Sequence, residues 1–398
     1  PLLAQAQTEP APAPAVEAAP APAQAELAAV TLPAPVQVAQ AAPVVAPASP
    51  EPMVAATAAP PAVDEGSKPL EVNVWGRIGN SVVKPKSVDA DTMVDAEVDL
   101  LLNGRIHKYV GWTADFVATY GPGTSGTKST ASILDLIGKF EFADAFNVWF
   151  GRMLVPSDRS NFSGPWFMSA WNYPGFYQPG PPTGPRQGAF GRNDGATVWG
   201  QFGGGLLKYY AGAFGLSEPG SSPLYTSRIN LSLINPEPGY YHSSTYYGGK
   251  DILALGLSAQ YQKNGSVGPA PVGGMAPIDD FSGVSADLLF EKNTGAGTID
   301  LEGAFYLFNG DNELVENHFY ALASYLIPGE IGIGRLQPLV RYQQATPKAG
   351  GTNWKIMDAQ IGYAIKEYAA RLALGYQRKD LGGDSVSNAF ILGIQLQK

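Results

Sequence analysis

Apolar and polar residues alternate in segments of about ten residues throughout the chain from Leu70 to Lys398. Clusters of Gly, Pro, Asn and Asp separate these segments and favour turns. Repeated alternation of this kind is typical of a transmembrane β-barrel, whose strands present one face to lipid and the other to the lumen. We therefore predict an all-β, antiparallel transmembrane barrel for residues 70–398, preceded by a segment of a different kind.

The composition fits a barrel and disfavours several other classes of protein. Charged residues make up 15% of the 398 residues, yet no stretch approaches the ~20 consecutive apolar residues of a membrane helix. The chain has no cysteine and three histidines, which rules out disulfides and disfavours Cys/His metal sites. We therefore expect no metal and no cofactor. A net charge of −9 argues against nucleic acid as a partner.

Residues 1–69 have the composition of a linker. Ala, Pro and Val dominate this segment, and it contains no aromatic residue. Proline fixes φ and removes backbone donors, so we predict an extended, polyproline-like spacer. Three roles remain open for it: a leader without a specific role, a periplasmic tether, or a segment that binds a partner or the barrel mouth. Ala4-Gln5-Ala6 has the form of a signal-peptidase site, so residues 1–6 are expected to be the end of a signal peptide.

The alternation predicts about sixteen strands, an even number as in bacterial single-chain barrels. In one of them, Leu301 and Phe305 alternate with Asp300 and Glu302. Short turns alternate with longer loops, as periplasmic turns and extracellular loops do. The last strand is expected to close the barrel against the first and so remove the free edges. The predicted strands are residues 70–83, 92–105, 107–120, 129–142, 145–155, 193–202, 205–216, 224–235, 251–263, 281–292, 297–309, 313–327, 333–345, 353–366, 368–379 and 386–397.

The longest predicted internal loop, residues 156–192, follows the fifth strand and is rich in Trp, Phe and Tyr. Loops of this length are usually functional or disordered. Aromatic side chains need a surface against which to bury, which argues against disorder. We therefore regard this loop as the main candidate for a functional element.

The start of this loop carries a resemblance to a known family. The stretch Phe150-Gly151-Arg152-Met153-Leu154-Val155-Pro156-Ser157-Asp158-Arg159 resembles the Gly-Arg/Lys-x-x-x-Pro passage of the phosphate-selective porin O/P family. In that family the passage ends a strand and opens the constricting loop. The resemblance covers residues 70–398 and implies a sixteen-stranded, trimeric, water-filled channel with loop 156–192 folded into the lumen. It does not imply phosphate selectivity, because the loop region has only a few arginines, accompanied by Asp158 and Asp194.

Charged residues of both signs lie on the predicted inner face. Opposed rows of carboxylates and guanidinium groups would orient polar solutes and set an ion preference. The alternative is that these residues pair between neighbouring strands and only make the inner wall of the barrel hydrophilic. The predicted pore-lining and constriction residues are Arg77, Asp95, Glu97, Asp99, Asp115, Arg152, Asp158, Arg159, Arg186, Arg192, Asp287, Asp300, Glu302, Arg335, Arg341, Asp358 and Arg371.

Two further patterns have a functional and a plain interpretation. The carboxylates of Asp95, Glu97 and Asp99 share one face at strand spacing, and either bind a divalent cation or form a solvated stripe. Tyrosines surround His242 in the stretch 240–247, and either pack that loop or form a platform for carbohydrate. The histidines are scattered, and the chain has no nucleophile elbow, phosphate loop or zinc motif, so we do not expect an enzyme.

The sequence therefore predicts an outer-membrane porin of a Gram-negative bacterium, which lets ions and small polar solutes diffuse passively. Loop 156–192 and the luminal charged rows would set its selectivity, and residues 1–69 would lie in the periplasm. The expected partners are outer-membrane lipid and lipopolysaccharide, further copies in a homotrimer, and a periplasmic or cell-wall partner of residues 1–69. Three alternatives stay open: a structural anchor that tethers such a partner, a barrel sheath around another protein, and a gated, substrate-specific transporter, which would need a plug.

Overall fold

The computed structural model describes residues 68–86, 89–123, 126–176, 185–215, 222–268, 275–383 and 385–398. The predicted spacer lies outside the described residues up to residue 67, and so does the expected signal-peptide end at residues 1–6. Their roles therefore stay predictions. The described residues contain no helix that is both long and apolar enough to cross a bilayer.

The described residues form sixteen antiparallel strands and two short helices. They are β1 Lys68–Pro85, β2 Asp91–His107, β3 Val110–Gly123, β4 Gly126–Ala143, β5 Phe146–Leu154, α1 Arg159–Ser163, η1 Ala189–Gly191, β6 Arg192–Phe202, β7 Leu207–Phe214, β8 Leu224–Ile234, β9 Ile252–Val267, β10 Ile278–Asn293, β11 Thr298–Asn309, β12 Val315–Leu326, β13 Arg335–Pro347, β14 Trp354–Lys366, β15 Ala370–Asp380 and β16 Val386–Gln397. Each strand lies within a few residues of its predicted position.

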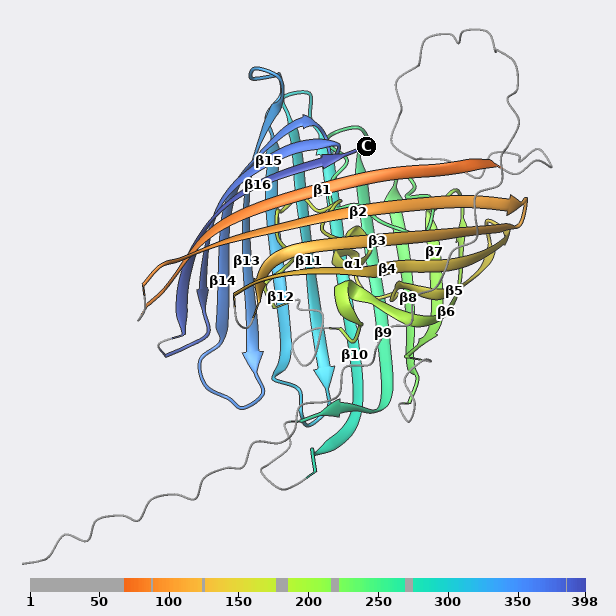
Figure 1. Cartoon of the computed structure of the whole chain (residues 1–398), viewed down its shortest axis with the longest axis horizontal. Coiled ribbons are helices and arrows are strands. Elements are labelled where there is room, and N and C mark those ends of the chain that lie inside the picture. The colour runs from red at the N-terminus through yellow and green to blue at the C-terminus, as the bar shows by residue number, and fades with distance from the viewer. Residues whose placement is uncertain are drawn as a thin grey trace, which may run out of the picture. The chain divides into compact units, whose positions relative to one another are not determined.

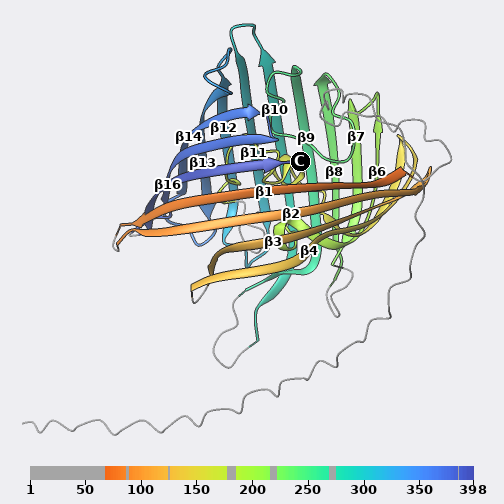
Figure 2. The ribbon, with the colours of Figure 1, turned by 45° about the horizontal axis from the view of Figure 1, so that its top comes forward.

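These strands close into a single barrel (Figure 1). Each strand pairs with its neighbours in sequence, and β1 pairs with both β2 and β16, between which it lies in Figure 2. Closure satisfies the backbone hydrogen bonds of every strand edge, which a sheet in lipid requires. The predicted all-β barrel of sixteen strands is therefore confirmed, together with the pairing of its last strand with its first.

The two faces of the wall differ as the alternation predicts. On β1, the side chains of Val72, Val74 and Ile78 point outward and are 52%, 50% and 54% exposed, whereas Arg77 is 9% exposed. On β11, the inward Asp300 is buried while its apolar neighbours are exposed. An apolar outer face and a polar inner face are the arrangement that a barrel in lipid needs.

The connections between strands lie on two rims. Because neighbouring strands are antiparallel, connections after even-numbered strands share the rim that holds the start of β1 and the end of β16, here called the turn rim. Most of them are short. In the connection 203–206, Gly203, Gly204 and Gly205 have φ values of 60°, 65° and 101°, which other residues adopt at a cost. The connection 235–251, between β8 and β9, is a long exception to the predicted short turns.

Candidate constriction site

The loop that joins β5 to β6 comprises residues 155–191, close to the predicted 156–192. Its described part folds into the barrel rather than away from it, and α1 appears inside the ring of strands in Figure 1. Helix α1 begins after Asp158, whose carboxylate accepts a hydrogen bond from the Ser160 amide at 3.2 Å. All five residues of α1 are buried. The passage 150–159 thus ends a strand and opens an inward loop, as the resemblance implied.

Aromatic packing holds the first part of this loop against β4–β8. The ring centroid of Phe162 lies 5.0 Å from that of Tyr210 and 5.3 Å from that of Tyr240. Trp149 of β5 belongs to the same buried cluster. Aromatic pairs at these distances stabilise a fold beyond their buried area. Four described aromatic residues of the loop, Phe162, Trp166, Trp171 and Phe176, are buried, in line with the argument against disorder, whereas Phe190 is 41% exposed.

A buried ionic network fixes α1. The Arg159 guanidinium donates to both carboxylate oxygens of Glu237, at 2.8 and 2.7 Å. Its backbone amide donates to Asp287 of β10 at 3.2 Å, and Asp287 also accepts from Arg228 of β8 at 2.5 and 3.0 Å. Asp158 accepts from the Tyr306 hydroxyl at 2.5 Å. Such charge-assisted pairs are strong when both partners are buried and hydrogen-bonded.

Three of the predicted luminal arginines bind the backbone of the loop. Arg77 donates to the Trp171 carbonyl at 2.7 Å. Arg341 donates to the carbonyls of Asn172 and Tyr173 at 2.8 and 3.2 Å. Arg371 donates to the carbonyls of residues 165 and 168. These guanidinium groups do face the lumen, but the loop covers them, so they do not form a free basic row.

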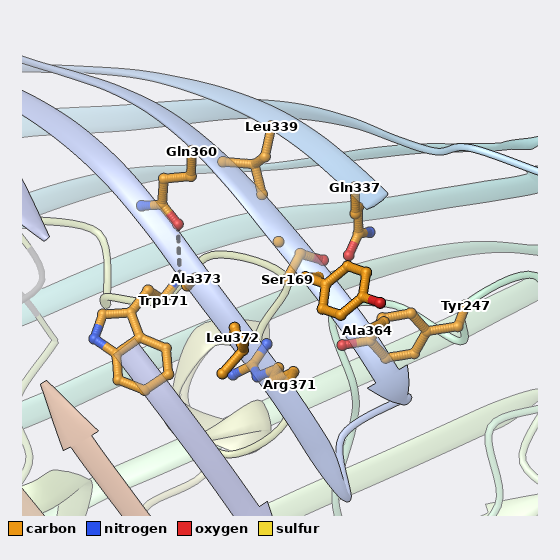
Figure 3. A pocket seen from close by; sticks show the side chains of 12 residues that line it. Ser169, Trp171, Tyr247, Gln337, Leu339, Gln360, Ala364, Arg371, Leu372 and Ala373 are labelled. Carbon is orange, nitrogen blue, oxygen red and sulfur yellow. Dashed lines mark hydrogen bonds between the residues drawn. The ribbon is translucent and has the colours of Figure 1, made fainter. Parts of the chain in front are cut away.

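The middle of the loop packs closely on the strands near the β1–β16 seam. The Trp171 amide donates to Gln360 of β14 at 2.9 Å, as the dashed line in Figure 3 shows. The indole of Trp171 lies against Ala373 and Gly393, where a Cβ on Gly393 would collide with the ring. The cavity in Figure 3, next to these contacts, has a volume of about 10 Å³. It has room for about one water molecule.

The end of the loop is held by two further ion pairs. Arg186 pairs with Glu313, and its backbone exchanges two hydrogen bonds with Gln260 of β9, at 2.8 and 3.0 Å. Arg192, the first residue of β6, pairs with Asp135 of β4 at 3.2 Å. Burial lowers the pKa of the Arg186 guanidinium, and the carboxylate of Glu313 partly opposes this effect. These contacts anchor the C-terminal end of the loop to the wall.

The carboxylates of β2 and β3 form the luminal acidic face on the other side of the loop. Asp95 is exposed and Glu97 is half-buried, and Glu97 lies opposite Arg77 in the strand register. Asp99 is buried and accepts a hydrogen bond from the Trp166 indole at 2.8 Å. Asp115 is 2% exposed. The described residues contain no group of His, Cys, Asp or Glu side chains that could hold a metal ion, so the divalent-cation interpretation has no support.

Arg152 departs from the predicted luminal row. It lies in register with Leu136, which is 53% exposed on the outer face, and with Asp194. The Arg152 guanidinium and the Asp194 carboxylate form an ion pair at 3.6 Å. On β5 the inward positions are those of Asn147 and Trp149, so residue 152 falls on the outward face. The prediction of Arg152 as a luminal residue is therefore wrong.

The remaining predicted residues lie on the inner wall of β11–β14. Asp300 accepts from the Ser169 hydroxyl at 2.9 Å, and Glu302 accepts from the Tyr320 hydroxyl at 2.6 Å. Asp358 pairs with Arg341 at 3.0 Å. Arg335, at the start of β13, donates to a carbonyl of the 235–251 connection at 3.4 Å. Cross-strand pairing and contacts to the loops thus account for most of these charges.

Several residues of the site escaped the sequence analysis. Glu237, the partner of Arg159, lies in a loop rather than on a strand, and its signal was a single carboxylate between two prolines. Asp135 and Glu291 lie on inward positions that the alternation marked, but no motif singled them out. Lys208 is fully buried and donates to two carbonyls of the 235–251 connection, at 3.1 and 3.3 Å. Aromatic residues follow Lys208 in the sequence, and nothing there indicated that its side chain binds a loop in the lumen.

The tyrosines around His242 pack the 235–251 connection. Tyr240 and Tyr247 are buried, whereas Tyr241 is 39% exposed. His242 lies 3.4 Å from the Lys208 ammonium and 3.6 Å from a Glu237 oxygen. Burial lowers the pKa of His242 well below its usual range, and the charge of Lys208 adds to this effect. Loop packing thus accounts for Tyr240 and Tyr247.

No protein-family model matches the sequence, and neither does any curated protein. Solved structures share the fold. The high-pH structure of OprB from Pseudomonas putida matches with a TM-score of 0.62 and 11% identity, over 84% of this chain and 94% of that one. OmpF of Salmonella typhi in complex with daunomycin matches with a TM-score of 0.56 and 12% identity, over 83% of this chain and 97% of that one. The trimer form of OmpT from Vibrio cholerae matches with a TM-score of 0.51 and 12% identity, over 83% of this chain and 100% of that one.

The chain therefore has the fold of a sixteen-stranded, porin-like outer-membrane β-barrel. At these identities the likeness concerns the fold, and function has to be argued from the site. The three structures do not single out the phosphate-selective porin O/P family, so that finer resemblance stays a prediction.

Proposed function

We propose that the protein is an outer-membrane porin, a passive diffusion channel for ions and small polar solutes. The observation that carries this proposal is the described part of loop 155–191, residues 155–176 and 185–191, which lies in a closed, polar-walled lumen and narrows it. Constriction of a wide aqueous barrel by fixed polar groups is a physical basis of selectivity in channels. The loop contacts strands around the lumen, among them β2 through Asp99, β10 through Asp287 and β14 through Gln360. It leaves little of the wide lumen that a sheath around another protein would need.

Single-channel recording in planar bilayers tests the proposal. We expect stepwise, persistent conductance from the full chain and from a chain that starts at Lys68, the first residue of β1. Conductance from the shorter chain alone would make residues 1–67 a plug. Silence from both chains would contradict the porin proposal and favour the structural anchor.

We expect the channel to prefer cations. Arg341 is neutralised by Asp358, and Arg371 is buried beneath the loop, whereas Asp95 and Glu97 reach water. The reversal potential in a KCl gradient should therefore have the sign of a cation-selective pore. The double variant Asp95→Asn/Glu97→Gln should bring the permeability ratio of K⁺ to Cl⁻ close to unity, because exposed luminal carboxylates set the local field.

The control for this experiment is Glu330→Gln, which removes one exposed charge from the connection between β12 and β13. This variant should keep the reversal potential of the unchanged protein. An anion-selective reversal potential in the unchanged protein would contradict the assignment of the acidic face while leaving the channel proposal intact.

We also propose that the protein forms homotrimers within outer-membrane lipid and lipopolysaccharide. The ion pair of Arg152 and Asp194 faces outward six residues beyond Phe146, the first residue of β5. For a tilted strand this places it about 15 Å above the turn rim, near the middle of the ~25 Å apolar band. An arginine that faces lipid there costs about 2–4 kcal/mol. A neighbouring subunit would shield the pair from lipid.

Sedimentation in mild detergent tests this surface. The variant Arg152→Ala removes the guanidinium of this ion pair from the contact, and it should shift the protein from trimer towards monomer. Val340→Ala, on the outward face of β13 and eight strands away, should leave the trimer intact. A protein that is monomeric before any substitution would refute the trimer.

A further inference from the structure

The connection 235–251 starts from the turn rim and folds into the lumen, where it meets the inward loop from the other rim. The Ser244 amide donates to the Phe167 carbonyl at 2.9 Å. The Tyr368 hydroxyl, in the turn between β14 and β15, lies 2.9 and 2.7 Å from the carbonyl oxygens of Phe167 and Thr245 and shares its single proton between them. Two loops that enter from opposite rims are thus hydrogen-bonded to each other inside the barrel.

Buried carboxylates hold this connection in place. Glu291 of β10 accepts three hydrogen bonds from it: from the Thr245 hydroxyl at 2.6 Å, and from the amides of Tyr246 and Gly248 at 2.7 Å each. Glu237, a member of the connection, binds the guanidinium of Arg159 in α1 with both oxygens. The connection is therefore fixed to the wall on one side and to the constricting loop on the other.

The two loops cover the β8–β12 side of the lumen and leave part of the β1–β4 side accessible, at the level of Asp95 and Glu97. On the covered side, the inward residues Asn230 of β8, Ser258 of β9, Asp300 of β11 and Ser324 of β12 are at most 5% exposed. On the β1–β4 side, Asp95 is exposed and Glu97 is half-buried. Deeper on the same face, Asp99, Asp115 and Asp135 are at most 4% exposed. The accessible part of the acidic face is therefore at Asp95 and Glu97.

We propose that the connection 235–251 is a second constricting element, which closes the β8–β12 side of the lumen and restricts solutes to the acidic β1–β4 side. Glu237 is its positioning residue: it holds Arg159, and through Arg159 it sets where helix α1, at the start of the inward loop, lies. The proposal rests on the channel function proposed above. It goes beyond that function in naming the route and in adding a constricting element from the turn rim.

Accessibility of single cysteines to a charged thiol reagent tests the route, because the chain has no cysteine of its own. Thr119→Cys places a thiol on the β1–β4 side, opposite Glu97 in the strand register. Ser324→Cys places one on the covered side with little change in side-chain size. A cationic methanethiosulfonate, added to the full-length protein in bilayers, should reduce the current of Thr119→Cys. Its reaction with Ser324→Cys should be slower by about a factor of ten or more, because only the fraction of molecules with open loops reacts.

The role of Glu237 is tested in the Ser324→Cys background. Adding Glu237→Gln weakens the pair with Arg159 and should raise the reaction rate of Cys at position 324 severalfold. A disulfide between Ser163→Cys and Ser244→Cys, whose hydroxyl oxygens lie 3.4 Å apart, joins the two loops. Formation of this disulfide in the Glu237→Gln protein should again slow the reaction of Cys at position 324. A general loss of stability would not be reversed in this way.

Two results would overturn the inference: equal reaction rates at positions 119 and 324 in the otherwise unchanged protein, or a rate at position 324 that does not respond to Glu237→Gln. Labelling of the folded protein in lipid vesicles, measured by mass, gives the same comparison without any current. If the protein carries no current but labels as expected, the channel proposal fails while the two-loop closure of the lumen stands.

Discussion

Replacing Arg159 with Met is expected to destabilise the barrel by about 3–5 kcal/mol, the usual cost of removing one partner of a buried ion pair. Arg159 is fully buried and pairs with Glu237, which is also buried. Without the guanidinium, the Glu237 carboxylate stays in the interior with no cation in direct contact. Burial alone raises the pKa of Glu237, but the charge and hydrogen bonds of Arg159 outweigh it and hold that pKa well below its usual range.

Urea unfolding in lipid vesicles, followed by tryptophan fluorescence, measures this loss. Arg105→Met is the matched control, because Arg105 pairs with Glu141 on the same inner wall but both side chains are partly exposed. It should cost at most about 1 kcal/mol. The double variant Arg159→Met/Glu237→Leu should recover most of the loss, since apolar replacement of a whole buried pair is often neutral. An unchanged unfolding midpoint for Arg159→Met would show that the network does not stabilise the fold.

Acidification below about pH 6.5 is expected to destabilise the 235–251 connection through His242. This imidazole faces Lys208 of β7, Arg159 of α1, Glu237 of its own loop, and the rings of Phe162 and Tyr210. Burial and the neighbouring cations keep it neutral in the folded protein, whereas the unfolded chain binds a proton below its usual pKa of about 6.5. Stability is therefore lost as the pH falls below that value, by up to about 1.4 kcal/mol per pH unit.

The Glu237 carboxylate acts in a separate pH window. Its pKa in the folded protein is depressed, so its stabilising contribution is present above the unfolded value of about 4.3 and is lost only as the pH falls below it. Between pH 7.5 and 5, the loss of stability of the connection should therefore come from His242 and not from Glu237.

Unfolding midpoints of three proteins at pH 7.5, 6 and 5 test this prediction. His242→Gln should show a flatter dependence on pH than the unchanged protein, and His107→Gln, exposed at the end of β2, should show the same dependence. His318 is buried on β12 and remains in all three, so its effect cancels in the comparison. Equal slopes for His242→Gln and the unchanged protein would contradict the assignment.

Most of the barrel could be predicted from local pattern. In β11, the alternation of Leu301 and Phe305 with Asp300 and Glu302 has the period of a strand between lipid and water, and the structure orients these residues accordingly. A two-residue period needs no knowledge of distant residues, because lipid and water select each face separately. The observed strand ends differ from the predicted ones by a few residues, because the contacts of the loops determine where strand pairing stops.

The orientation of Arg152 shows where local pattern failed. The Gly-Arg passage marked the end of a strand correctly, but it did not indicate which face the arginine occupies. Gly151 has a φ of 119°, and the next residue lies outward in register with Leu136. A one-residue difference in register moves a side chain to the opposite face of a strand. Only the pairing with β4 and β6 settles that register.

The sequence by itself determined a sixteen-stranded barrel, a polar lumen and an ordered aromatic loop after the fifth strand. Tertiary structure alone decided what each luminal charge contacts. Arg77 and Arg159 look alike in sequence, yet one binds the Trp171 carbonyl and the other binds Glu237, 78 positions away. The physical reason is that alternation depends on the nearest neighbours in sequence, whereas buried polar groups find their partners across the lumen. Many of those partners lie on two loops that contact each other inside the barrel. No local pattern in the sequence predicts that contact.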